Sequence, residues 1–298
     1  MARSLRLGTS KTIGLIVADI SNVFYAAIAR NIEDEAAKHG YNVMFMSSLE
    51  DPMKEKKMIR LLLDRGMDGL IISTSFKAKE DIHQLREGNV PFVLIDRYLP
   101  GVKTNCVLVD NYQGAFEMTE HLISLGLNRI ALLKISPSHI STMIGRTEGY
   151  KGALRKNGIP VSNKLIRVIP HDSIFESMRS VIKELVFERN IQSLFFLNNN
   201  LAKAGLEVLN KFNLRVPQDI SIGSFDDIDL FRFSYPTITS IKQPLEEIGR
   251  LAFQVLVKEI KSKDKFIEKQ QVVLPVKLIV RNSCGSFFRK KMNGSVTD

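Results

Sequence analysis

The sequence predicts an α/β fold made of two doubly wound lobes, each with a parallel sheet. Apolar runs of strand length alternate with segments of helical period, and strands that are apolar throughout are typical of parallel sheets covered on both faces. Five such runs precede Gly126, enough for one sheet, and a second alternating series follows. With 298 residues, 44% hydrophobic and 25% charged, the chain can bury the core that such a fold needs.

The predicted strands are residues 12–18, 41–47, 68–73, 92–96, 105–109, 129–134, 165–169, 193–197 and 220–225. Helices are expected between them. Ile28, Ile32 and Ala36 recur at intervals of four and predict a core-facing stripe, while Asp51 and Pro52 predict an N-cap and a first helical residue. A long helix over 245–260 and a final strand over 272–280 complete the series.

Composition and motifs exclude several functional classes. No apolar run reaches membrane-spanning length and the start of the chain does not resemble a secretory signal, so we expect a cytoplasmic protein. Cys106 and Cys284 are far apart, and no histidine pair has metal-ligand spacing, so we expect no metal and no cofactor. The chain also lacks nucleotide-binding, nucleophile-elbow and zinc-protease motifs, which predicts a protein that is not an enzyme and has no catalytic residues.

Polar side chains follow nearly every predicted strand. In open α/β sheets, ligands bind beyond the carboxyl ends of the strands. The residues at those positions are Asp19, Ser21 and Asn22, then residues 73–75, then Asp96 and Arg97, Asp110 and Asn111, residues 198–200, and Asp226 and Asp227. Carboxylates, amides and guanidinium groups near aromatic rings suit a polyhydroxylated ligand, because each hydroxyl both donates and accepts hydrogen bonds.

The chain resembles the lactose/galactose-repressor (LacI/GalR) family of transcriptional regulators over residues 2–285. The motifs that carry the resemblance occur in family order: residues 12–16 (TIGLI), 19–25 (DISNVFY), 95–97 (IDR), 109–111 (VDN), 146–150 (RTEGY), 216–221 (VPQDIS), 239–244 (TSIKQP) and 281–285 (RNSCG). The resemblance implies a periplasmic-binding-protein type I-like fold, with a ligand cleft between the lobes. It also implies an N-terminal lobe of residues 11–126 plus 243–270 and a C-terminal lobe of 127–242 plus 271–285.

The same resemblance implies roles for individual residues. The expected effector contacts are Asn22, Phe24, Tyr25, Asp96, Arg97, Arg146, Asn198, Asp226 and Gln243, with Phe175 in a loop over the cleft. Asn200 is expected to cap the helix that follows, which leaves Asn198 for the ligand. Each residue also has a plainer interpretation. Asp96 and Arg97 would form a surface ion pair, and Phe24 or Tyr25 would belong to the core. Val23 and Asn199 stand where the family often has Pro and Asp.

The start of the chain resembles the family's DNA-binding hinge. Leu5 occupies the position that wedges into the minor groove, with Arg3 and Ser4 beside it. We interpret residues 1–10 as a hinge remnant and linker without the preceding helix-turn-helix head, and residues 286–298 as a flexible tail.

The resemblance therefore implies a homodimeric sensor, without membrane association, that alters operator DNA affinity allosterically. Its effector would be a sugar, sugar acid or sugar phosphate, and a protein co-repressor is a further possible partner. A transport-type sugar-binding protein is the alternative.

Overall fold

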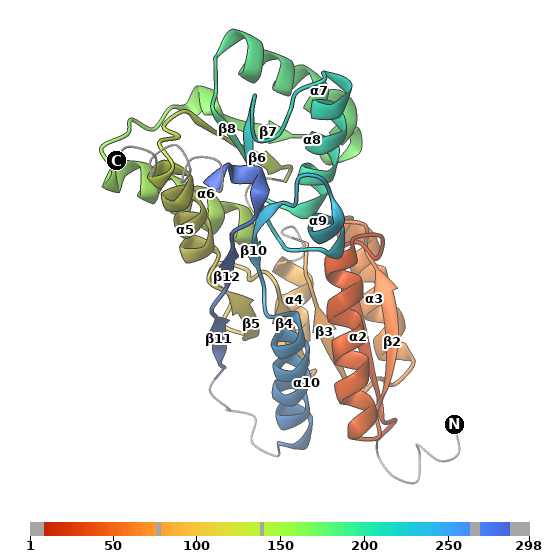
Figure 1. Ribbon diagram of the computed structural model, residues 1–298. Coiled ribbons are helices and arrows are strands. Elements are labelled where there is room, and N and C mark those ends of the chain that lie inside the picture. Colours follow the sequence, from red (N-terminus) through yellow and green to blue (C-terminus); the bar gives the residue numbers. More distant parts are fainter. Residues whose placement is uncertain (1–8, 76–78, 138–139, 263–268, 287–298) are drawn as a thin grey trace. The chain divides into compact units, whose positions relative to one another are not determined.

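The computed structural model describes residues 9–75, 79–137, 140–262 and 269–286 (Figure 1). The chain divides into two compact units. The first unit contains Met1–Val109 and Pro244–Leu274, and the second contains Asp110–Gln243 and Pro275–Asp298. The chain therefore passes from one unit to the other three times.

The first unit is built on a fully parallel sheet. Its strands are β1 (Thr12–Val17), β2 (Asn42–Ser47), β3 (Gly69–Ile72), β4 (Phe92–Ile95), β5 (Asn105–Val109) and β11 (Gln271–Leu274). Their order in the sheet is β11-β5-β4-β3-β1-β2. The inner strands β3 and β4 are buried along their whole length, whereas the edge strands β2 and β11 are partly exposed. Burial on both faces explains why the inner strands are continuous apolar runs.

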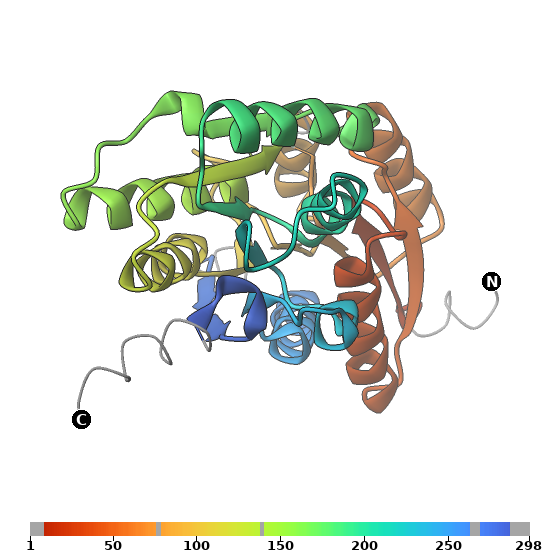
Figure 2. The ribbon, with the colours of Figure 1, turned by 45° about the horizontal axis from the view of Figure 1, so that its top comes forward.

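Helices cover both faces of this sheet (Figure 2). They are α2 (Val23–Lys38), α3 (Pro52–Asp64), α4 (Lys79–Glu87) and α10 (Leu245–Lys261). Helices α3 and α4 pack on one face through one shared apolar cluster, while α2 and α10 pack against each other and α10 contacts β3, β4 and β5. The predicted stripe of Ile28, Ile32 and Ala36 is fully buried, and Asp51 caps α3 by accepting from the amides of Met53 and Lys54.

The second unit repeats this strand order. Its strands are β6 (Ile130–Ile135), β7 (Ile166–Ile169), β8 (Ser193–Phe196), β9 (Ser221–Phe225), β10 (Thr239–Lys242) and β12 (Lys277–Ile279). The order β12-β10-β9-β8-β6-β7 matches that of the first sheet position by position, except that β12 runs antiparallel to β10. The predicted architecture of two doubly wound, parallel-sheet lobes is confirmed.

The helices of the second unit are α5 (Asn111–Ser124), α6 (Ser141–Lys156), α7 (Ile174–Lys183), α8 (Asn199–Lys211) and α9 (Asp229–Phe233), with a turn of π-helix after α7. Helices α5 and α6 pack tightly, as do α7 and α8. Gly149 permits the first contact, because a Cβ there would lie 2.2 Å from the carbonyl oxygen of Tyr112. No helix in the described part of the chain is long and apolar enough to cross a membrane.

The predicted domain boundaries differ from the structure. The first lobe was expected to reach residue 126, but the first passage between units follows Val109, so α5 belongs to the second unit. Helix α5 contacts α6, β9, β10 and β12, all of the second unit. The pattern of apolar residues marks where a helix ends, and it does not identify the sheet that the helix covers. The return passages follow Gln243 and Leu274, one and four residues beyond the expected positions.

The single strand predicted over 272–280 is also wrong. Pro275 divides this segment into β11 and β12, which belong to different sheets. The sequence reasoning missed β10, which was taken only as the approach to α10. Of the predicted tail, residues 287–298 lie outside the described residues, and Ser286 is buried.

Candidate functional site

Polar side chains gather at the carboxyl-terminal edge of the sheet in the first unit. Asp96 and Arg97 follow β4, and residues 73–75 follow β3, the neighbouring strand. Parallel strands end at one edge of a sheet, so consecutive strand ends bring these residues together. All five are buried.

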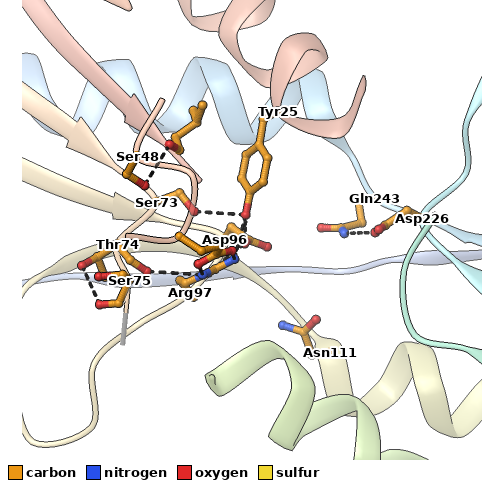
Figure 3. Close-up of polar contacts among 12 residues, drawn as sticks. Tyr25, Ser48, Ser73, Thr74, Ser75, Asp96, Arg97, Asn111, Asp226 and Gln243 are labelled. Atoms are coloured by element: carbon orange, nitrogen blue, oxygen red, sulfur yellow. Dashed lines mark hydrogen bonds and ion pairs between the residues drawn. The ribbon is translucent and has the colours of Figure 1, made fainter. Parts of the chain in front are cut away.

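The hydroxyl of Tyr25 links these side chains (Figure 3). It donates to Asp96 Oδ2 at 2.9 Å and accepts from Arg97 at 2.8 Å and from Ser73 Oγ at 3.3 Å. Burial raises the pKa of the Tyr25 phenol well above its ordinary value, so the hydroxyl keeps the proton that it donates. Tyr25 is therefore both a core side chain of α2 and a member of the polar cluster. Phe24 packs edge-on against it, with 5.0 Å between ring centroids, and is likewise buried.

Arg97 forms a two-pronged ion pair with Glu50, which the sequence reasoning did not identify. The two terminal guanidinium nitrogens donate to Glu50 at 2.8 and 3.0 Å, and Nε donates to Asp96 at 3.3 Å. Burial by itself lowers the pKa of Arg97, but Tyr25, Glu50 and Asp96 together hold it well above the usual value. Glu50 lies in the loop after β2, so the rule applied to the other strands would have found it.

Glu55 of α3 was also missed, because it does not follow a strand. It is fully buried and accepts from Thr74 Oγ1 at 2.5 Å and from the amide of Ser75 at 2.6 Å. Burial raises the pKa of Glu55. Glu55 thus holds the loop after β3 in place beneath the cluster.

The second unit carries a comparable cluster around Arg146 of α6. Its guanidinium donates to Asn111 Oδ1 at 2.8 Å and to the carbonyl of Leu197 at 2.6 Å. The same group lies 3.7 Å from the ring centroid of Phe225 and 3.8 Å from Asp226 Oδ1. Arg146 is buried, and its hydrogen bonds connect α5, α6 and the end of β8.

Gln243 completes the second cluster. Its Nε2 donates to Asp226 Oδ1 at 2.6 Å, and its Oε1 is buried without a hydrogen-bond partner in the described part of the chain. A carboxylate accepts only from the N–H side of an amide, so this bond fixes which amide atom is Oε1. The first cluster, in the first unit, consists of residues 25, 50, 73–75, 96 and 97. The second cluster, in the second unit, consists of residues 111, 146, 226 and 243.

Asp96 and Asp226 occupy equivalent places in their units. They follow β4 and β9, which hold the same position in the two sheets, and both have left-handed backbone angles, with φ of 66° and 69°. Aspartate is one of the few residues that tolerate this conformation. The turn makes each carboxylate available to its own cluster.

Asn22 and Asn198 are helix caps in the structure. Asn22 Oδ1 accepts from the amide of Phe24, and Asn198 Oδ1 accepts from the amide of Leu201. The expectation that Asn200 caps α8 is wrong, because α8 begins at Asn199, two residues earlier than an Asn200 cap requires. Both asparagines lie at strand ends, as predicted.

The structure does not bring Phe175 to either cluster. Phe175 lies in the first turn of α7 rather than in a loop, and it packs against the core of the second unit. Lys211, in the last turn of α8, has its Nζ 4.1 Å from the Phe175 ring centroid, whereas Asn198 caps the opposite end of that helix. Arg3, Ser4 and Leu5, the predicted DNA contacts, lie outside the described residues.

Comparison with known proteins agrees with this architecture. Residues 10–282 match the family described as periplasmic binding proteins and sugar binding domain of LacI family. The chain belongs to this family. The resemblance seen in the motifs, and the fold that it implied, are confirmed.

Relatives of this LacI-family chain are transcriptional regulators. The ribose operon repressor of Halalkalibacterium halodurans is 32% identical over 285 residues, which are 95% of this chain and 82% of that protein. The crystal structure of transcription regulator CcpA of Lactococcus lactis has a TM-score of 0.82 at 27% identity and covers 91% of this chain and 98% of its own. A LacI family regulator from Enterococcus faecium, solved with bound ribose, has a TM-score of 0.78 at 28% identity, with coverage of 91% and 98%.

Proposed function

We propose that this chain is the effector-sensing core of a transcriptional repressor and that its effector is a sugar or sugar derivative. The observation that carries the proposal is the pair of buried polar clusters at equivalent strand ends of the two units. Membership of the LacI family and the ribose bound to a relative support the ligand class.

In this proposal one effector contacts both clusters. Asp96 and Arg97 bind hydroxyls from the first unit, and Arg146, Asp226 and Gln243 bind them from the second. Phe24 and Tyr25 wall the site, and Asn22 and Asn198 contact the ligand from the helix starts that they cap. A ligand held by both units favours the arrangement in which both reach it, so binding shifts the population toward that arrangement. Three chain passages transmit the shift, which changes operator affinity.

A homodimer is part of the proposal, because each half of a two-fold operator needs its own reading unit. The second unit offers an apolar surface that suits a second copy. Leu230, Phe233 and Tyr235 are exposed, and Leu230 and Tyr235 line a cavity of about 940 Å³ together with Leu214, Val216 and Pro236. Exposed apolar side chains gathered in one place are typical of protein interfaces.

A thermal-shift screen tests the proposed effector class. The chain is heated alone and with neutral sugars, sugar acids, sugar phosphates and purines. A ligand at about one hundred times its Kd adds about 2.7 kcal/mol to the free energy of unfolding, a shift of several degrees. We expect a selective shift with one sugar or sugar derivative, and recovery of that sugar unchanged, since the proposed sensor does not catalyse a reaction.

No shift with any sugar would contradict the effector assignment and would favour control by a protein co-repressor. A monomer that binds sugar but alters no operator affinity when joined to a reading head would instead favour the transport-type alternative.

A further inference from the structure

We propose that the effector is an uncharged, hydroxyl-rich sugar and that Glu50 excludes sugar acids and sugar phosphates by occupying Arg97. The inference rests on the proposed function and names its ligand class. Two independent features support it. The guanidinium groups of Arg97 and Arg146 are already paired within the protein, and the buried side-chain oxygen of Gln243 has no hydrogen-bond donor among the described residues.

The first feature is that Glu50 already holds Arg97 in the two-pronged arrangement that an anion would need. One terminal nitrogen donates to Glu50 and to the carbonyl of Thr74, and the other donates to Glu50 and to the Tyr25 hydroxyl. The remaining nitrogen, Nε, donates to Asp96. Glu50 takes both prongs of the guanidinium, which is the geometry that a ligand carboxylate or phosphate would otherwise use.

The net charge of the first cluster also disfavours an anionic ligand. One guanidinium faces the carboxylates of Glu50 and Asp96, so the ionised members of the cluster carry a net negative charge. All three side chains are largely shielded from water, where charges are screened less than at the surface. An anionic ligand would meet this negative charge, whereas a neutral sugar would meet carboxylate oxygens that accept from its hydroxyls.

The second cluster supplies no compensating positive charge. Arg146 donates to Asn111 and to the Leu197 carbonyl, stacks on Phe225 and lies 3.8 Å from the carboxylate of Asp226. Its charge is balanced by Asp226, and the Phe225 ring lies against the guanidinium. Neither cluster therefore offers the uncommitted cation that an acid or phosphate group requires.

The second feature is the orphaned oxygen of Gln243. Its side chain is 4% exposed, its Nε2 is held by Asp226, and its Oε1 has no partner among the residues that the structure describes. A buried acceptor without a partner is costly, so the atom that completes it must be a donor. Every sugar hydroxyl carries a proton to donate, whereas an ionised carboxylate or phosphate group is an acceptor only. Gln243 therefore calls for a ligand hydroxyl, and the exclusion of charged groups rests on Arg97 and the charge of the first cluster.

Matched ligand pairs test the inference with the unaltered chain. Calorimetric titration compares D-ribose with its phosphate monoester, and D-glucose with its phosphate monoester and with gluconate. For each pair that binds, we expect the neutral sugar to bind more tightly than its charged partner by about tenfold or more.

A charged ligand that binds more tightly than its neutral parent would overturn the inference while leaving the proposed sensor intact. Absence of binding by every pair would overturn the proposed function and this inference together.

The role of Glu50 is tested by E50Q, which removes one charge and keeps one acceptor oxygen. We expect E50Q to tighten binding of the charged partner by about tenfold and to change binding of the neutral sugar much less. E87Q is the matched control, because Glu87 is an exposed residue at the end of α4 and its substitution changes the net charge equally. Equal behaviour of E50Q and E87Q would remove Glu50 as the cause of exclusion. The comparison of pairs on the unaltered chain still decides the ligand class if E50Q folds poorly.

Discussion

Asp226 is the residue on which the second cluster depends. Its carboxylate accepts from the side-chain amide of Gln243 and from the backbone amide of Asn199, and it lies near Arg146. One side chain thus joins the ends of β8, β9 and β10 with α6. Asp96 joins the Tyr25 hydroxyl and Arg97 in the first unit in the same manner.

The substitution Asp226→Asn should weaken sugar binding by about tenfold or more, because it removes a charged acceptor at a buried site. The measurement is calorimetric titration with the sugar identified by the thermal-shift screen. Asp229→Asn is the control, since the Asp229 side chain is 86% exposed in the same segment and should leave binding unchanged. Equal affinity of both variants and the parent would remove Asp226 from the site.

The thiol of Cys284 has an unusually low pKa. Burial raises the pKa of this thiol, but hydrogen bonds with His121, Thr239 and Ser286 outweigh burial and lower it to about 7. His121 Nε2 lies 3.3 Å from Sγ. Burial instead raises the pKa of Cys106, so ultraviolet titration of thiolate in Cys106→Ala should show a midpoint near pH 7.

The lowered pKa of Cys284 makes the free energy of unfolding depend on pH. A folded-state thiol pKa below the unfolded value of about 8.5 stabilises the fold above that pH, and the contribution is lost as the pH falls through about 7. His121→Asn should raise the thiol pKa and reduce the extra stability at alkaline pH. A midpoint near that of an ordinary thiol in Cys106→Ala would contradict the pairing.

Among the helices and strands, the N-cap residues set where each helix begins. A side chain that caps a helix already has one of its oxygens engaged. Asn198 both caps α8 and stands at the end of β8, beside the cluster of the second unit. Two substitutions separate these roles. Asn198→Ala should lower the free energy of unfolding by about 1 kcal/mol, whereas Asn198→Ser retains a capping oxygen and most of that stability.

If Asn198 contacts the sugar, both variants should weaken binding, because neither reaches the ligand as asparagine does. Chemical denaturation and calorimetric titration measure the two effects separately. Unchanged sugar affinity in both variants would leave Asn198 with the capping role alone.

The α5–α6 contact provides a matched pair of glycines. A Cβ at Gly149 would meet the backbone of Tyr112 and Phe116, which cannot move without shifting α5. A Cβ at Gly152 would meet the Tyr112 hydroxyl, the far end of a side chain that can turn away. Gly149→Ala should therefore lower the free energy of unfolding by about 1–3 kcal/mol, and by more than Gly152→Ala. Equal losses in chemical denaturation would show that the helices have room to adjust.

At the scale of the whole molecule, two sheets of equal strand order are joined by three passages of the chain. The strand order of the first sheet repeats in the second. A polar cluster lies at the carboxyl-terminal edge of each sheet, so the two clusters occupy equivalent places in the topology.

Tyr235 tests the proposed homodimer. It is fully exposed at the rim of the cavity in the second unit, beside Pro236. Tyr235→Asp should convert the dimer to monomers in light scattering, because burying a carboxylate at an apolar interface is unfavourable. Because the Tyr235 side chain is exposed, the melting of the isolated chain should change little. A dimer of unchanged affinity would place the interface elsewhere.

The amino-acid sequence predicts the fold class, nearly every strand and the strand ends that carry the candidate ligand contacts. Apolar runs such as β3 and β4 identify buried parallel strands without further information, because the burial of both faces leaves no polar position. The residues after each strand then follow from the rule that parallel strands end at one edge. Asp96, Arg97 and Asp226 were found in this way.

Which polar residues lie together depends on the packing of segments that are distant in the sequence. The sheet to which α5 belongs and the division of β11 from β12 depend on contacts between segments far apart in sequence. Glu50 meets Arg97 across 47 positions, and Glu55 meets Thr74 across 19, so no local pattern marks either pair. Hydrophobic periodicity reports how deeply a residue is buried, whereas the partner of a buried charge is set by the packing of distant elements.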